Sequence, residues 1–224
     1  MSEQTSQEPL TGWRREVILT LDRWIYRLAK RWLALFNLAV GIYVLLPVLA
    51  PVLMAGGAPR IGQAIYVLYR PSCHQLPERS IFLFGPQRTY SLEELIGAGL
   101  ISPQDGNLER QRFLGTPGIG YKVAICQRDL ALYGSIVALG LVFGLVRKRL
   151  RPLRLWAFGL LLLPMMIDGT TQLLMLRESN WVLRFITGTL TGVACVWLLY
   201  PHLEEAFDDL RRQANKRVHL EPES

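Results

Sequence analysis

The chain has 224 residues, of which 50% are hydrophobic and 19% are charged, and its formal net charge is +7. This composition is too apolar for a disordered chain, and three cysteines are too few for a disulfide-dense secreted module. Because the basic residues lie beside long apolar runs, the positive charge indicates a membrane rather than a nucleic acid as partner. A soluble enzyme is disfavoured for the same reason.

Four segments are apolar over the roughly 20 residues that a membrane-crossing helix requires. They cover residues 32–54, 129–146, 155–176 and 181–200. A fifth apolar segment, Ile61–Tyr69, is too short to cross a bilayer and is expected to form a re-entrant or surface helix. We therefore predict an all-α membrane protein built on a bundle of four transmembrane helices.

The distribution of Lys and Arg predicts the orientation of this bundle. Fifteen of the 25 basic residues lie before residue 32, in residues 147–154 and after residue 210, which a four-span topology places on one side. The positive-inside rule then predicts a protein of the plasma (cytoplasmic) membrane with both termini in the cytoplasm. The lipid bilayer is its expected partner, beside a membrane-protein partner or a second copy, and no nucleic acid is expected.

Two terminal segments flank the membrane domain of residues 32–200. In residues 1–31 apolar side chains recur at helical spacing between basic ones, which predicts an amphipathic helix lying at the inner membrane interface. The alternative is a solvated helix packed on a partner. Residues 201–224 form a charged cytoplasmic tail, expected as an exposed helix that frays.

The extracytoplasmic loop of residues 56–125 is too long to be only a connector. Within it, Ser91–Glu94 has the pattern of a capping box, in which a serine and a glutamate three residues later satisfy the first backbone amides of a helix. We therefore expect a small folded extracytoplasmic cap.

Two glycine-rich patterns are assigned to structure rather than to chemistry. Gly115–Gly120 lacks the lysine of a phosphate-binding loop and is expected to be a turn into the second span. Gly188 and Gly192 are spaced for close helix packing, and Cys195 beside them is expected to be an inert apolar residue.

Two charged residues lie inside predicted spans, where charge is costly and normally has a partner. Asp168 and Arg184 are therefore expected to pair, either as a structural ion pair or as part of a site. Pro164 would kink the span beside Asp168 and favours a cavity there. Thr171 and Gln172 share a helix face with Asp168 and are the candidates for positioning a substrate.

The remaining candidate ligands also fall on the extracytoplasmic side. Cys73, His74, Cys126 and Asp129 are side chains that a divalent transition metal, zinc above all, accepts. The spacing is a weak signal, because adjacent Cys and His do not easily bind one ion. A Cys73–Cys126 disulfide and a free or redox-active thiol remain as alternatives.

At these motifs the chain resembles a family of small multi-pass membrane proteins of unknown function from bacteria and archaea. The likeness runs through CHQLPERS from Cys73, CQRD from Cys126, DGTTQ from Asp168 and RESN from Arg177. The second motif of that family usually ends in Cys, whereas this chain has Asp129. The departure is compatible with a metal site and weakens a redox mechanism that requires two neighbouring thiols.

The leading hypothesis is a membrane-embedded enzyme with a metal site on the extracytoplasmic side. Asp168 would act as general base, oriented by Arg184. An anionic, lipid-like or small substrate would be bound by Arg79, Arg128, Arg177 and Glu178. The alternatives are a thiol–disulfide protein linked to a quinone and a non-catalytic subunit of a membrane complex.

Overall fold

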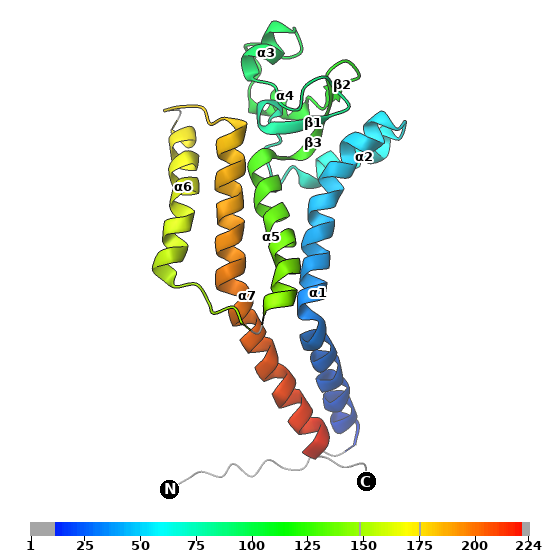
Figure 1. Cartoon of the computed structure of the whole chain (residues 1–224). Helices are drawn as coiled ribbons and strands as arrows, with labels where there is room; N and C mark the ends of the chain where they lie inside the picture. Colours follow the sequence, from blue (N-terminus) through cyan, green and yellow to red (C-terminus); the bar gives the residue numbers. More distant parts are fainter. Residues whose placement is uncertain (1–11, 148, 175, 221–224) are drawn as a thin grey trace.

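A computed structural model describes residues 12–147, 149–174 and 176–220. Four helices form the body of the molecule: α1 (Trp13–Ala55), α5 (Gln127–Val146), α6 (Leu155–Leu173) and α7 (Trp181–Leu220). They stand side by side, with a small cap over one end and a two-helix stalk at the other (Figure 1). We call these the cap end and the stalk end. The ends of the predicted terminal segments, residues 1–11 and 221–224, lie outside the described residues.

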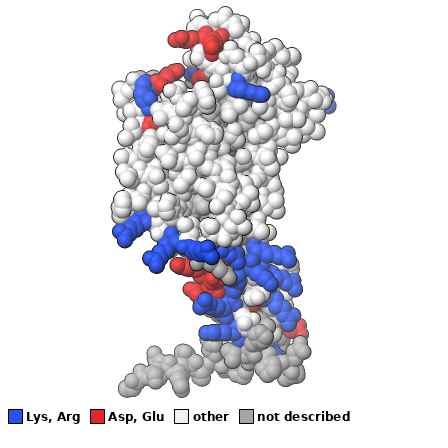
Figure 2. All heavy atoms as spheres, in the orientation of Figure 1, with Lys and Arg blue, Asp and Glu red and all other residues white. Residues whose placement is uncertain are grey.

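Three helices are long and apolar enough to cross a membrane, over Arg15–Ala55, Gln127–Val146 and Trp181–Lys216. Large apolar side chains on the bundle face outward, and Leu145 is 88% exposed. Such a surface requires lipid around it. Figure 2 agrees, because a broad band with almost no charge separates the basic stalk from the charged residues of the cap. The chain is therefore a membrane protein with apolar helices.

The fourth predicted span corresponds to α6, which packs along α7 (Figure 1). It has 19 residues and contains Pro164 and the buried Asp168. It is not among the three candidate membrane helices found in the described residues. Polar residues near its cap end reduce its apolar character, because they contribute to the site described below.

Gly188 and Gly192, the two glycines predicted for close helix packing, allow α5 and α7 to approach each other closely. A Cβ atom at Gly188 would lie 2.5 Å from the Arg128 carbonyl oxygen, and one at Gly192 would lie 2.6 Å from the Leu132 carbonyl oxygen. Both distances are shorter than van der Waals contact, so the packing role predicted for these glycines is confirmed.

Gly192→Ala is expected to lower the stability of the bundle by about 1–3 kcal/mol, the usual cost of overpacking a tight interface. Gly159→Ala is the matched control, because a Cβ atom at Gly159 in α6 has no neighbour within 4 Å. Thermal unfolding in detergent should separate the two variants. If Gly192→Ala unfolds like Gly159→Ala, the close contact between α5 and α7 does not hold.

The all-α expectation is wrong for the cap, which contains a three-stranded antiparallel sheet. Its strands are β1 (Ser80–Leu83), β2 (Gly115–Thr116) and β3 (Gly120–Cys126), in the order β1-β3-β2. The glycine-rich segment is therefore a hairpin turn into β3, not a turn into the second span. Gly120 has a φ of 84° and lies against the Leu83 backbone, where a side chain would not fit.

Short helices complete the cap: α2 (Pro59–Tyr69), η1 (Pro77–Arg79), α3 (Leu92–Gly97) and α4 (Asn107–Arg112). The predicted capping box is confirmed, because Ser91 and Glu94 bond each other's backbone amides at the start of α3. The short apolar segment also forms the expected helix. Its Ile65 and Tyr66 join α1 and β3 in one apolar core.

The predicted separate interfacial helix at the N-terminus is instead the first part of α1, and the tail likewise continues α7. No glycine or proline interrupts residues 13–40, so nothing in the sequence stops the helix at the membrane boundary. The two extensions pair into the stalk. Trp32 Nε1 donates to Glu204 Oε2 at 2.9 Å, and its ring stacks on Phe207 with 5.3 Å between the ring centroids.

Candidate functional site

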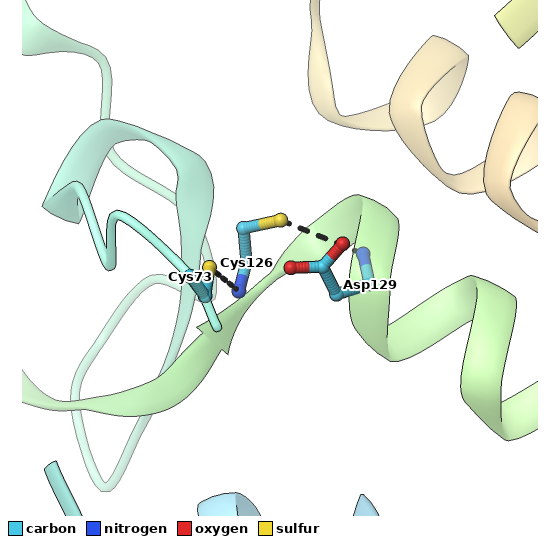
Figure 3. Close-up of side chains that lie close together, drawn as sticks. All are labelled: Cys73, Cys126 and Asp129. Atoms are coloured by element: carbon cyan, nitrogen blue, oxygen red, sulfur yellow. Dashed lines mark hydrogen bonds between the residues drawn. The ribbon is translucent and has the colours of Figure 1, made fainter. Parts of the chain in front are cut away.

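Three predicted ligands meet where the cap joins the bundle. Cys73 follows α2, Cys126 is the last residue of β3 and the N-cap of α5, and Asp129 lies in the first turn of α5. Their ligand atoms all lie within 4.8 Å of one another. Figure 3 shows the Asp129 carboxylate directed back toward the two cysteines. We call these three residues the Cys–Cys–Asp cluster.

Backbone contacts hold the cluster together. The Cys126 amide donates to Cys73 Sγ at 3.2 Å, and the Asp129 amide donates to Cys126 Sγ at 3.5 Å. Cys126 caps α5 from the preceding strand, which turns its sulfur toward the first turn of this helix.

The two thiols of the cluster differ in acidity. A hydrogen bond from Cys126 lowers the pKa of Cys73, and it outweighs the burial that would raise this pKa. The same hydrogen bond, followed by burial, raises the pKa of Cys126. Cys73 is therefore the first thiol to ionise, and all three cysteines are free in the structure.

His74 lies outside the cluster that Cys73 joins. Its side chain is exposed, whereas Cys73 is 7% exposed, because neighbouring residues in this extended turn face different sides. His74 still lines the adjoining cavity. Adjacent Cys and His do not easily bind one ion, and in the structure the side chains of Cys73 and His74 indeed face different sides.

The cluster forms one wall of a cavity of about 430 Å³, which we call the main cavity. The opposite wall comes from α6, through Met165, Gly169, Gln172 and Leu173. Three arginines, Arg79, Arg128 and Arg184, complete the lining together with polar residues of the cap. Eight of the twelve predicted site residues thus lie around one cavity.

The three arginines, called here the arginine cluster, surround the Gln172 carboxamide. In one amide orientation its oxygen accepts from Arg128 Nη2 at 3.3 Å. In the orientation that satisfies both ends of the amide, it accepts from Arg184 Nη2 at 3.0 Å and Arg79 Nε at 3.2 Å. Three like charges therefore converge on one uncharged group.

Arg184 is the most deeply placed member of the arginine cluster, with 5% of its surface exposed. Its Nη1 donates to the Glu78 carbonyl at 3.1 Å and to Gln127 Oε1 at 3.3 Å. Its Nε is buried without a hydrogen-bond partner among the described residues. Arg184 thus connects α7 to the cap.

The expected Asp168–Arg184 pair is not the pairing that forms. Asp168 is 2% exposed, and one oxygen accepts from Arg128 Nη2 and from Ser179 Oγ, the latter at 2.9 Å. Its other oxygen accepts from Arg177 Nη2 at 2.7 Å. Arg128, at the start of α5, reaches Asp168 across the helix interface, whereas Arg184 is directed into the cap.

Three further predicted residues do not line the main cavity, and two of them, Thr171 and Arg177, lie beside Asp168. Thr171 Oγ1 donates to the Ile167 carbonyl at 2.7 Å and accepts from Arg177 Nε at 3.3 Å. Arg177 is half-exposed. Glu178 is exposed and lines a second cavity of about 460 Å³, which Arg184 also touches.

Two residues of the site were not predicted. Gln127 is 3% exposed, and its Nε2 donates to the Ser80 carbonyl at 3.0 Å while its Oε1 accepts from Arg184. Ser179 is 5% exposed and binds Asp168. Gln127 lies in the motif CQRD and Ser179 in the motif RESN. Their position beside charged residues is the sequence signal that could have identified them.

Lys122 of β3 is fully buried near Cys73 of the Cys–Cys–Asp cluster. Its Nζ donates to the Gln75 carbonyl and, at 2.9 Å, to the Gln111 carbonyl. Burial is the main cause that lowers its pKa from 10.5 to about 7. A neutral amine can donate both hydrogen bonds, so the side chain joins β3 to the turn at Gln75 and to α4 without requiring a buried charge.

This lysine predicts a pH-dependent stability. Between the folded pKa of about 7 and the unfolded value of 10.5 the unfolded chain binds the extra proton, so stability rises with pH and is lost as the pH falls. Relative to Lys122→Met, the wild type should gain about 2 kcal/mol between about pH 7 and pH 9. Thermal unfolding of both chains across this window provides the measurement, and parallel pH profiles would contradict it.

Comparisons with known proteins agree with a membrane location. Residues 118–198 match the model of a family described as "Predicted membrane protein (DUF2085)". The chain is also 29% identical over 144 residues to "Uncharacterized protein MJ1492" of Methanocaldococcus jannaschii, covering 63% of this chain and 69% of that protein. No solved structure matches the chain. These likenesses and the apolar helices support a membrane protein similar to an uncharacterised membrane family.

Proposed function

We propose that this chain is a four-span enzyme of the plasma membrane, with both termini in the cytoplasm and a metal site at its extracytoplasmic cap end. The apolar α6 beside α7 supports the fourth span. The basic stalk in Figure 2 supports a cytoplasmic location for the stalk end. The main cavity then opens on the outer side, where the substrate is bound.

One observation carries the proposed chemistry. Two thiols and a carboxylate, from two separate parts of the chain, bring their ligand atoms within 4.8 Å on the wall of a cavity. Zinc is held by these ligand types, and catalytic zinc sites typically have three protein ligands with one position open to water or substrate. His74 lines the same cavity and is the remaining candidate ligand.

A metal ion in this position supplies a Lewis acid and an activated water. The chain's own residues provide the rest of the proposed site. The arginine cluster binds an anionic substrate and Gln172 orients it. Asp168, engaged by three donors, fixes Arg128 in place, and Arg177 and Thr171 hold Asp168 from the other side.

A second candidate function is a thiol–disulfide protein. The free thiols of Cys73 and Cys126 lie close together, and Cys73 is the more acidic. Oxidation to a disulfide would release two electrons and two protons, which a membrane quinone can accept. Asp129 in place of a third cysteine leaves no further thiol in the cluster to pass the disulfide on.

Elemental analysis of the purified chain, with thiol counting under non-reducing conditions, separates the two functions. The metal site predicts one zinc or similar ion per chain and two cysteines that become reactive only after chelation. A metal-free chain with a Cys73–Cys126 disulfide would instead support the redox function. A metal-free chain with two free, unprotected thiols would support neither and favour a non-catalytic subunit.

A further inference from the structure

The arginine cluster has more positive charge than its surroundings balance. Three guanidinium groups meet at one carboxamide, and Arg79 and Arg128 repel the charge on Arg184. Asp168 bonds only Arg128 of the three, and it shares its charge with Arg177. Among the described residues, Asp129 is the carboxylate that lines the main cavity, and it faces the cysteines.

The donors of the cluster are also incompletely used. The Nε atoms of Arg184 and Arg128 are buried without a hydrogen-bond partner among the described residues. Buried polar groups are normally satisfied, and a buried guanidinium without a counter-charge is costly. The α5 N-terminus adds positive potential at the same wall, because Arg128 and Asp129 lie in its first turn. Together these features predict a bound anion.

The number of cations indicates which anion. A carboxylate has one charge and two oxygens, which one arginine satisfies in a bidentate pair. A phosphate monoester has nearly two charges and three terminal oxygens, and planar guanidinium groups match its geometry. Three arginines around one position therefore suit a phosphate monoester better than a carboxylate.

The other wall of the main cavity indicates what the phosphate is attached to. Met165 and Leu173 of α6 line the cavity, and Met166 and Ile167 on the same helix are 60% and 52% exposed. In a membrane helix such side chains contact lipid tails. A volume of about 430 Å³ suits a head group, while an apolar chain can lie outside along α6.

We infer that the main cavity binds the phosphate monoester head group of a membrane lipid, with Arg79, Arg128 and Arg184 on the phosphate and the lipid chain along α6. This inference names the substrate class of the proposed function and depends on it only for the main cavity being the substrate site. Arg79 is the best residue to test, because it is less buried than Arg184 and, unlike Arg128, has no part in the Asp168 pairing.

The test is calorimetric titration of the purified full-length chain in detergent with three probes: short-chain phosphatidic acid, inorganic phosphate and short-chain phosphatidylcholine. Phosphatidic acid should bind at least about tenfold more tightly than the other two, since each tenfold corresponds to about 1.4 kcal/mol. Equal binding of inorganic phosphate would overturn the lipid part and leave a free phosphate site. No binding of either phosphate would overturn the inference.

Variants locate the site. Arg79→Gln should weaken phosphatidic acid binding at least about tenfold, because it removes charge-assisted hydrogen bonds. Arg112→Gln, at an exposed arginine of α4, should leave binding unchanged. If Arg79→Gln does not fold, Arg79→Lys is the variant to use. It should bind with intermediate affinity, since lysine retains the charge but cannot form the paired hydrogen bonds of a guanidinium group. Wild-type affinity in these Arg79 variants would place the ligand elsewhere.

Phosphatidic acid binding by a chelator-treated chain distinguishes the proposed phosphate site from the proposed metal site. The arginine cluster predicts that phosphatidic acid still binds after any metal is removed, although more weakly if the ion also contacts the phosphate. Retained binding by a chain that never contained metal would support the phosphate site and reject the metal site. Metal content without phosphate binding would give the opposite result.

Discussion

Asp168→Asn is expected to lower the free energy of unfolding by about 3–5 kcal/mol, the usual cost of removing one partner of a buried ion pair. The carboxylate is 2% exposed and accepts from Arg128, Arg177 and Ser179. The asparagine retains the shape but leaves Arg128 without its counter-charge, at membrane depth. Thermal or chemical unfolding in detergent provides the measurement.

Two controls define what this loss means. Glu178→Gln removes an exposed carboxylate ten residues further along the chain and should change stability by less than about 0.5 kcal/mol. Adding Arg128→Gln to Asp168→Asn should recover part of the loss, because the uncompensated charge is then absent. Additive losses in the double variant would mean that Asp168 and Arg128 do not interact.

Cys73→Ser is expected to weaken metal binding by more than about 100-fold, since even outer-shell partners of a metal typically contribute 10- to 100-fold. Cys73 is the more acidic thiol of the cluster and is therefore the ligand that ionises most easily. Competition with a chromophoric chelator measures the affinity. Cys126→Ser should behave in the same way, and Asp129→Asn should lose less because the amide oxygen remains a weak ligand.

Cys195→Ser is the matched control for this series. Cys195 lies in α7, outside the Cys–Cys–Asp cluster, and only the cluster cysteines are expected to bind. The Cys195→Ser variant should bind the metal with the same affinity as the wild type. Equal losses in Cys195→Ser and Cys73→Ser would indicate unspecific thiol binding rather than the proposed site.

The gathering of polar residues at one end of the bundle could be predicted from sequence, but their pairing could not. Asp168 in an apolar helix requires a basic partner, and this requirement is visible in the sequence. Which arginine satisfies it depends on helix rotation and on how the cap is inserted. Arg128 begins α5 and Arg177 follows α6, so both reach Asp168 from outside its own helix.

The sequence does not predict the strand that precedes α5. Val123 and Ile125 belong to β3, and only the polar residues from Gln127 to Asp129 separate this short apolar run from the apolar residues of α5. Periodicity cannot separate a short buried strand from the start of a membrane helix. The N-cap role of Cys126, which orients its sulfur, therefore became apparent only in three dimensions.

The continuous α1 shows the opposite limitation. The basic residues around Lys30 and Arg31 indicate a membrane boundary in the sequence, but α1 continues through it. Lys and Arg are good helix formers, so charge alone does not end a helix. Contacts with α7, such as those of Trp32 with Glu204 and Phe207, extend the helix pair beyond the apolar band.

X-ray absorption spectroscopy at the zinc edge, on the chain purified with its metal or reconstituted with zinc, tests the central claim most directly. The Cys–Cys–Asp cluster predicts two sulfur ligands at about 2.3 Å and lighter oxygen or nitrogen ligands at about 2.0–2.2 Å. The sulfur signal should fall to one in Cys126→Ser and stay at two in Cys195→Ser. A first shell without sulfur, or one unchanged by Cys126→Ser, would contradict a metal site built from Cys73, Cys126 and Asp129.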